Sequence, residues 1–442
     1  MKFESKQFMN VWSYIYITMI LLISLFISEF NILLFIAYFI LALPFINSIE
    51  HYVVISILLS TISYYFTGAY EGVYSIYTIL MLLIIARLIF DLKGKIEINR
   101  RCLLPISMLG VLACFSYVVS PFHYLIGLFR LLYLLFLSVI VGNFVRLKIS
   151  IICEILPKMA TVMVFGYIVS VLINGSFVNG RLAIASSINT NTFGMSCAQL
   201  GCILLTAAFL HKEQMKRNLF ICVLVLALGV LSGSRGALLA FGLSSLIVII
   251  SYVKKSGHLK GTMFNLAILG TIALASIYLF IILTGLDTSR FNISEIIASG
   301  GSRRTLIYET LIPYIIENGY WKFGYGAGHD CSRQLIISLT GWDYTHSHNT
   351  FLESFGELGI MGLMLFVYCI KKSLNNIYST CQINSDGYLI VAMFICLLIN
   401  GLAESYFFDA VLWLLLAVCW NNFMEKKEMK YYRNNIQGKL KY

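Results

Sequence analysis

Residues 123–145, HYLIGLFRLLYLLFLSVIVGNFV, contain Arg130 as their only basic or acidic residue apart from the opening histidine. A helix of about 20 apolar residues can cross the roughly 30 Å hydrocarbon core of a bilayer. Comparable stretches recur along the whole chain, at approximately 9–28, 31–47, 52–67, 73–90, 102–120, 157–174, 192–211, 218–232, 236–253, 263–284, 350–370, 387–402 and 406–421. We therefore predict an all-α, polytopic integral membrane bundle with about 12–14 transmembrane helices and one large periplasmic loop.

The composition excludes an ordinary soluble protein. Hydrophobic residues make up 59% of the 442 positions, charged residues 12%, and the mean hydropathy is +0.84. A soluble domain carries about 25% charged residues. We expect residues 1–442 to form a single integral membrane domain, because no linker or low-complexity segment separates a soluble part.

The basic residues favour one orientation, since cytoplasmic loops are enriched in lysine and arginine. With fourteen spans, the basic loops and both termini fall on one side, which we predict to be the cytoplasm. These loops contain Lys93, Lys95, Arg100, Arg101, Arg146, Lys148, Lys212, Lys216, Arg217, Lys254, Lys255, Lys260, Lys371 and Lys372, and a basic tail follows at 422–442. Topology thus accounts for much of the net charge of +11, and we expect no nucleic-acid partner.

Cations also occur on the side predicted to be outside, against the general trend. They lie in a large extracytoplasmic loop at 285–349, in a shorter segment at 175–191 and in the turn Ser232-Gly-Ser-Arg-Gly236. The outward-facing cations are Arg181, Arg235, Arg290, Arg303, Arg304, Lys322 and Arg333. Such a concentration suggests an anionic ligand.

Arg235 is the sharpest case, because it stands in a tight turn at the start of a span. A guanidinium matches phosphate geometry and stays charged at physiological pH, and a following helix N-terminus favours an anion. The alternative is an arginine that only reaches up to the membrane surface. Arg303 and Arg304 open a helical pattern with apolar residues at 306, 307, 311, 312, 315 and 316. A surface helix would bury that face in the membrane, and plain headgroup binding is the alternative role for the pair.

His346 and His348 lie where the large loop enters a span, followed by Glu353 and Glu357. A histidine at this point suits a general base at neutral pH, and the glutamates are candidates to orient it or to hold an acceptor. A histidine that only hydrogen-bonds at the interface is the alternative.

Two further patterns in the loop are weaker. The glycines of Gly324-Tyr-Gly-Ala-Gly328 either let backbone N–H groups approach a phosphate or form an ordinary turn. His329, Asp330, His346 and His348 share one loop, but their spacing matches no compact metal motif. We expect neither a metal nor another cofactor.

Four elements in chain order resemble the O-antigen ligase and O-antigen polymerase superfamily. They are Gly180-Arg181 with Asn189-Thr-Asn191, where Thr190 replaces a frequent proline; Ser232-Gly-Ser-Arg-Gly236; Arg304 four residues before Tyr308, with Gly324-Tyr-Gly-Ala-Gly328; and His348-Asn349 with Leu352-Glu353 and Gly356-Glu-Leu-Gly-Ile-Met-Gly362. Together they cover roughly residues 175–365.

The resemblance implies a metal-independent glycosyltransferase of the bacterial cytoplasmic (inner) membrane, with its active site facing the periplasm or the outside. The donor would be a polyprenyl-diphosphate-linked (undecaprenyl-type) oligosaccharide, as in lipopolysaccharide and other surface polysaccharide biosynthesis. Membrane lipids and a chain-length regulator are further partners that the resemblance suggests. By family position, Arg235 and Arg304 would bind the diphosphate, with Arg303 as the alternative.

By the same resemblance, His348 would be the general base of an inverting transfer, with His346 as the alternative. Arg181, Asn191, Asn349 and Glu353 would help to bind substrate. We favour a polymerase, which transfers a growing glycan onto a lipid-linked repeat unit, over a ligase, which transfers the glycan to lipid A–core.

Two readings from other classes remain. A flippase or transporter of lipid-linked oligosaccharides would place ionisable residues within spans of repeated halves. Here the notable ionisable groups concentrate in the outer loops, and no internal repeat is visible. A scaffold role would leave the outer cations without a purpose.

Overall fold

The computed structural model describes residues 2–26, 32–60, 75–90, 100–144, 146–178, 180–185, 189–256, 304–341 and 347–421. Its α-helices in the first half are α1 (Lys2–Phe26), α2 (Ile32–Ala42), α3 (Ile49–Ser60), α5 (Ile76–Phe90), α6 (Arg100–Val119), α7 (Leu125–Val139), α8 (Ile149–Asn174) and α9 (Thr190–Leu210). In the second half they are α10 (Met215–Leu231), α11 (Arg235–Ser256), α14 (Arg304–Glu317), α15 (His329–Thr340), α16 (Thr350–Cys381), α17 (Tyr388–Asn400) and α18 (Ala410–Trp420). Short 3₁₀ or π turns are η1 (Leu43–Asn47), η2 (Ile140–Phe144), η3 (Lys212–Gln214) and η5 (Ser385–Gly387).

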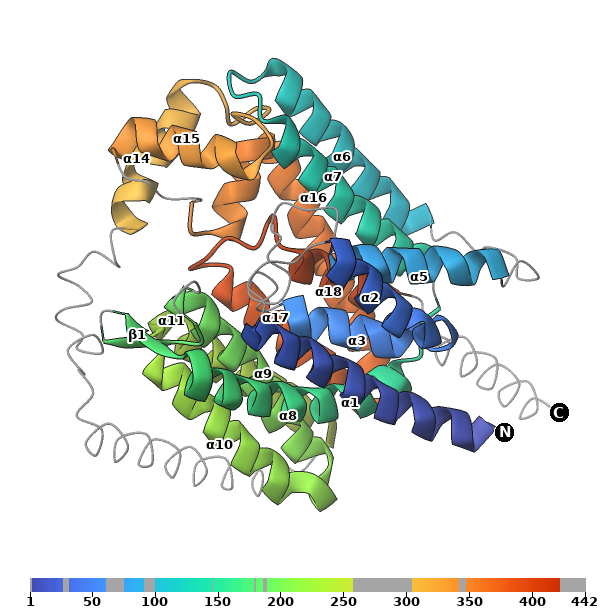
Figure 1. Ribbon diagram of the computed structural model, residues 1–442. Coiled ribbons are helices and arrows are strands. Elements are labelled where there is room, and N and C mark those ends of the chain that lie inside the picture. Colours follow the sequence, from blue (N-terminus) through green and yellow to red (C-terminus); the bar gives the residue numbers. More distant parts are fainter. Residues whose placement is uncertain are drawn as a thin grey trace.

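The helices form a polytopic bundle, as predicted (Figure 1). Within the described residues, seven helices are long and apolar enough to cross a membrane, and six more are apolar but shorter. The long ones include the quoted stretch, as Leu125–Asn143, and all thirteen coincide with predicted spans. The remaining predicted span, 263–284, lies outside the described residues, as does the basic tail at 422–442.

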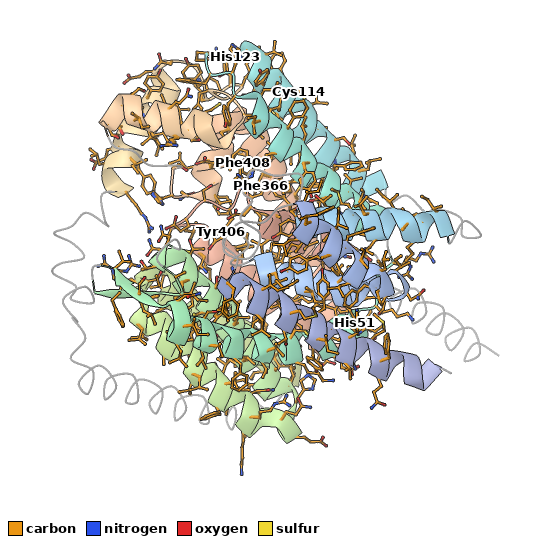
Figure 2. All side chains as sticks on the ribbon, in the orientation of Figure 1. His51, Cys114, His123, Phe366, Tyr406 and Phe408 are labelled. Carbon is orange, nitrogen blue, oxygen red and sulfur yellow. The ribbon has the colours of Figure 1, made fainter. Side chains whose placement is uncertain are left out.

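The centre of the bundle contains the helices that are apolar on all sides. Every residue of α18 is buried, and so is nearly all of α17. The ring of Phe366 on α16 packs edge-on against Phe407, with centroids 5.4 Å apart, and at 5.9 Å from Trp413. Figure 2 shows Phe366 and Phe408 in this central region. A helix that is hydrophobic all round is stable only when other helices or lipid surround it.

Helix α16 is interrupted at Gly359, which adopts φ 69° and ψ −170°. The irregular backbone is satisfied by the segment that precedes α15. Ile360 N donates to Trp321 O and Tyr325 N donates to Gly356 O, both at 2.8 Å. Broken backbone at membrane depth requires such protein partners, because lipid supplies none. The glycine-rich segment 324–328 is thereby fastened to α16.

The large loop contributes a small layer over one end of the bundle, built from α14 and α15 (Figure 1, orange). The helix predicted from the apolar spacing at 306–316 is present as α14. The prediction that its apolar face is buried in the membrane surface is wrong for half of that face, which packs against protein. Ile307, Leu311 and Ile315 are buried in a separate cluster with residues of α15, while Ile316 is 55% exposed. Contact of the exposed edge of this face with the membrane surface stays a prediction.

The segments of the described chain that carry the candidate site residues lie at the same end of the bundle. This end contains the C-terminal ends of α8, α10 and α17 and the N-terminal ends of α9, α11, α16 and α18. A short antiparallel hairpin, β1 (Ser176–Val178) with β2 (Arg181–Ala183), joins α8 to α9 there. At the other end, His211 lies 3.7 Å from Asp386, close to the basic residues Lys212, Lys216 and Arg217. The predicted separation of the outer segments from these basic residues is therefore present in the bundle.

Candidate functional site

His348 stands at the entrance to α16 in an unusual backbone conformation. Its φ is 55°, and among the described residues it is the only one besides glycine with a positive φ. A side chain in this left-handed region costs about 1–2 kcal/mol. Such conformations persist only where surrounding contacts hold them, and they often occur at functional sites. The backbone therefore marks His348, which the sequence selected as the candidate general base.

Glu404 connects His348 to an arginine. It lies in the segment between α17 and α18, and its Oε2 is 2.8 Å from Nδ1 of His348. Its Oε1 accepts a hydrogen bond from Nη2 of Arg304 at 2.7 Å. Only 12% of the Glu404 side chain and 15% of the His348 side chain are exposed. A carboxylate at Nδ1 stabilises the tautomer with the proton on that nitrogen, so that the lone pair lies on Nε2.

The segment that carries Glu404 is attached to the first residue of α16. Thr350 N donates to Gly401 O at 2.8 Å, and Thr350 Oγ1 donates to Glu404 O at 3.0 Å. Tyr406 N donates to Thr350 Oγ1 at 2.9 Å. These bonds hold Glu404 next to His348, although the two residues lie on different segments of the chain.

Tyr308 holds the other side of His348. Its hydroxyl, one helical turn after Arg304 on α14, donates to the carbonyl oxygen of His348 at 3.1 Å. Burial raises the pKa of Tyr308, although the nearby positive charge of Arg304 opposes the shift. The hydroxyl therefore stays protonated and remains a donor at physiological pH.

Arg181 extends the cluster on the side of α9. Its Nε donates to Ser232 O at 2.8 Å, and its Nη2 donates to Oδ1 of Asn191. Asn191 in turn donates from Nδ2 to Oε1 of Glu404, at a long 3.4 Å. The side chain of Arg181 lies across Gly233, where a Cβ would come within 3.1 Å of Nε. Glycine at 233 thus allows both the positive φ of 63° and the close approach of the arginine.

Arg235 is the first residue of α11, as the sequence predicted for the start of a span. The next residue, Gly236, lies against the Glu404 segment, because a Cβ there would be 3.5 Å from that of Ala403. Arg304, His348 and Asn191 therefore bind Glu404, and Arg181 is linked to it through Asn191. Arg235 begins the helix whose second residue lies next to the same segment.

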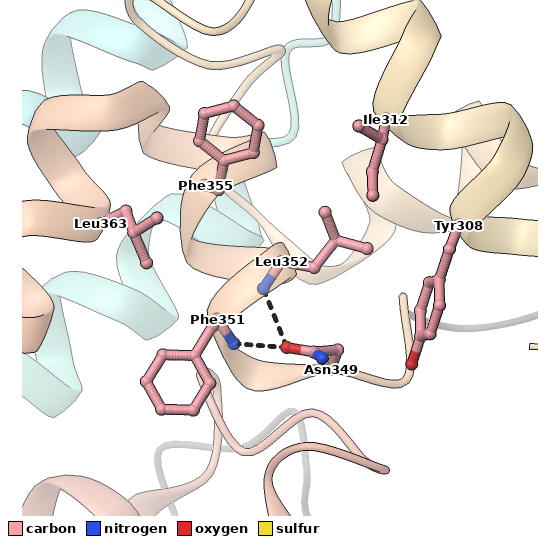
Figure 3. Close-up of a pocket in the computed structure, with 7 residues that line it drawn as sticks. All are labelled: Tyr308, Ile312, Asn349, Phe351, Leu352, Phe355 and Leu363. Carbon is pink, nitrogen blue, oxygen red and sulfur yellow. Dashed lines mark hydrogen bonds between the residues drawn. The ribbon is translucent and has the colours of Figure 1, made fainter.

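Asn349 caps α16. Its Oδ1 accepts from the backbone N–H groups of Phe351 and Leu352 at 2.9 and 3.0 Å (Figure 3). Glu353 is fully buried, and its Oε2 accepts from Ser347 N at 2.9 Å. The assignment of substrate binding to these two residues stays a prediction. His346 and Arg303, the alternatives for base and diphosphate ligand, lie outside the described residues.

An apolar pocket opens beside the cluster. Figure 3 shows Tyr308 and Ile312 of α14 facing Leu352, Phe355 and other residues at the start of α16. Its volume is about 270 Å³. One wall is Tyr308, the residue that holds His348, so the pocket adjoins the charged cluster. The arrangement accommodates a ligand with an apolar part next to an anionic part.

The glycine segment Gly324–Gly328 offers less to a ligand than the charged cluster does. Gly328 N donates to Oε2 of Glu357 at 3.0 Å, and Gly324 packs closely against the backbone of Glu357. Of the two interpretations of Gly324–Gly328, phosphate binding or an ordinary turn, the structure supports the turn. Among the side chains that the structure describes, no group of three or more His, Cys, Asp or Glu could hold a metal ion.

The sequence alone did not lead us to select Glu404, although Glu404 is the residue that joins the others. The available signal was an acid near the outer end of the last pair of spans, in a chain with few acids. Its partners are 56 and 100 positions away in the chain, and no local spacing connects them.

No curated protein matches the chain. Residues 220–367 match the model of a protein family described as O-antigen ligase. The matched segment contains Arg235, Arg304, Tyr308 and His348, whereas Arg181, Asn191 and Glu404 lie outside it. In this segment the chain is thus similar to the O-antigen ligase family, in agreement with the resemblance noted in the sequence.

Proposed function

We propose that the protein is a surface-polysaccharide polymerase. It transfers a polyprenyl-diphosphate-linked glycan onto a lipid-linked repeat unit on the outer face of the cytoplasmic membrane. The single observation that carries this proposal is the His348–Glu404–Arg304 cluster, which unites a candidate base with a cation at one end of a membrane bundle. The family match over residues 220–367 supports chemistry of the O-antigen polymerase or ligase type.

The transfer breaks the bond between the anomeric carbon and the diphosphate and forms a bond from that carbon to an acceptor hydroxyl oxygen. Nε2 of His348 takes the proton of the attacking hydroxyl, while Glu404 at Nδ1 stabilises the imidazolium that forms. Attack opposite the leaving group inverts the anomeric centre.

The leaving diphosphate gains negative charge in the transition state, and preorganised cations lower the energy of that state. Arg304 and Arg235 supply this charge in our proposal, and Arg181 with Asn191 shapes the same side of the site. The apolar pocket at Tyr308 and Ile312 suits the first isoprene units of the lipid carrier. Arginines can perform this role without a metal ion.

The ligase reaction is the second candidate, favoured by the description of the matching family. Its donor chemistry is the same, and only the acceptor differs, with lipid A–core in place of a lipid-linked repeat unit. The two activities are separated by offering each acceptor alone.

The test uses the purified full-length protein in liposomes, a polyprenyl-diphosphate-linked repeat unit and EDTA. We expect a ladder of longer lipid-linked glycans, which His348→Ala and Arg235→Ala both lose. His211→Ala and Lys216→Ala, at the opposite end of the bundle, serve as matched controls and keep the ladder. Product only with lipid A–core would establish a ligase. Transfer to neither acceptor, with the native donor sugar, would contradict both proposals and favour a transporter.

A further inference from the structure

Two glutamates on α16 are fully buried and take no part in the reaction proposed above. Glu353 and Glu357 lie one helical turn apart and therefore on the same face of the helix. Both have no exposed surface. A buried carboxyl group is costly unless hydrogen bonds compensate it, so its partners indicate what it holds in place.

Glu353 holds the backbone on the N-terminal side of His348. Its Oε2 accepts from Ser347 N at 2.9 Å, and Ser347 is itself fully buried. The hydroxyl of Ser347 donates to Asn349 O at 3.0 Å. The residue between these two anchored neighbours is His348, with its φ of 55°. Glu353 thus stabilises a conformation that a histidine otherwise avoids.

Glu357 supports the same arrangement from the glycine segment. Its Oε1 accepts from the hydroxyl of Ser332 at 2.9 Å, and its Oε2 accepts from Gly328 N at 3.0 Å. The hydroxyl of Tyr325 lies 2.8 Å from that of Ser332, and burial raises the pKa of Tyr325 well above its ordinary value. The tyrosine therefore stays a donor. Glu353 and Glu357 therefore hold the two sides of this arrangement from the same face of α16.

We propose that Glu353 is a positioning residue: through Ser347 N it fixes the left-handed backbone of His348 and so aims the imidazole at Glu404 and the acceptor hydroxyl. The inference rests on the proposed function for its kinetic consequence, but the geometry can be tested without it. Direct contact between the Glu353 carboxylate and substrate is the competing role. Full burial and the bond to Ser347 argue against that role.

Three substitutions of Glu353 distinguish the effect of its side-chain length from the effect of its charge. Glu353→Gln keeps the length and an oxygen that accepts from Ser347 N, and removes the charge. Glu353→Asp keeps the charge but withdraws the oxygen by one methylene group. Glu353→Ala removes the acceptor. A misplacement of about 1 Å can cost about 10²-fold in rate. We therefore expect kcat to stay near the wild-type value in Glu353→Gln and to fall by at least about tenfold in Glu353→Asp, with KM for the donor unchanged.

The second readout does not depend on transfer activity. Diethyl pyrocarbonate modifies neutral imidazoles, and mass spectrometry of the His348 peptide reports its rate. His123, an exposed histidine at the α6–α7 turn, is the internal reference (Figure 2). We expect the His348 rate relative to His123 to be the same in wild type and Glu353→Gln and changed in Glu353→Asp.

Loss of activity in Glu353→Gln together with retention in Glu353→Asp would overturn the proposal, because charge rather than position would then matter. An unchanged His348 modification rate in Glu353→Asp would overturn it as well. If wild type transfers to neither acceptor, the proposed function fails, whereas the modification rates still decide the positioning role. Glu353→Ala is interpreted only if its thermal unfolding resembles that of wild type.

Discussion

Oε2 of Glu404 lies 2.8 Å from Nδ1 of His348, although 56 positions separate the two residues in the chain. The same carboxylate binds Arg304 through Oε1 at 2.7 Å. One acid therefore sets both the tautomer of the candidate base and the position of a candidate diphosphate ligand.

Glu404→Gln should lower transfer activity but leave the fold intact. The amide can donate a hydrogen bond to Nδ1 and so favours the wrong tautomer, and it no longer attracts Arg304 as a charge. The loss should not exceed that of His348→Ala, which we expect to be about 10²–10⁴-fold for a general base. Initial rates of glycan transfer measure both. Glu309→Gln, at an exposed site on α14, is the matched control and should keep the wild-type transfer rate. Wild-type rates in Glu404→Gln would contradict the proposed dyad.

Tyr308→Phe removes the donor to the His348 carbonyl and keeps the ring. A hydrogen bond contributes about 0.5–1.5 kcal/mol net, so transfer should slow by roughly 2- to 10-fold. Because burial raises the pKa of Tyr308 above its ordinary value of 10.0, the hydroxyl is protonated throughout the neutral range. The ratio of wild-type to variant rate should therefore be constant between about pH 6 and 9. A ratio that changes in this range would mean that Tyr308 titrates there.

Gly359→Ala should destabilise the protein more than its φ alone requires. With φ 69° and ψ −170°, Gly359 lies in a region that is essentially restricted to glycine, and such a conformation costs an alanine about 1–3 kcal/mol. A Cβ at 359 would also lie 2.5 Å from Lys322 O and 2.7 Å from Phe323 N. Gly341 also has φ 69° but a ψ of 9°, and a Cβ there would meet nothing within 4 Å, so Gly341→Ala measures only the cost of an ordinary left-handed conformation. Thermal unfolding in detergent compares the two variants, and equal shifts would argue against the packing of segment 321–325 on α16.

Asn349→Ala should destabilise the start of α16 by about 0.5–2 kcal/mol through loss of the N-cap. Asn349→Asp retains a capping oxygen and should keep most of that stability. The pair also tests the prediction that Asn349 binds substrate. In that case, Asn349→Asp should raise KM for the donor, because a carboxylate repels the diphosphate. If KM does not change while stability is retained, the role of Asn349 is the cap alone.

Much of the fold could be predicted from the sequence because a membrane-spanning helix is recognisable from its local composition. About 20 consecutive apolar residues are sufficient evidence, and thirteen predicted spans coincide with apolar helices of the described residues. The break at Gly359 was not predicted. The break depends on segment 321–325, which supplies the hydrogen-bond partners of the interrupted backbone. The sequence around residue 359 does not predict that contact.

The candidate site shows the same division. His348, Arg304, Arg235 and Arg181 were recognisable individually, because ionisable residues at the outer ends of spans are unusual against apolar surroundings. The sequence by itself thus determined the membrane bundle and the kinds of side chain available for chemistry. Only the tertiary structure brought Glu404 between His348 and Arg304, placed Glu353 under Ser347 and gave His348 its positive φ. These contacts join residues on separate helices, and their geometry follows from how the helices pack, which local composition does not encode.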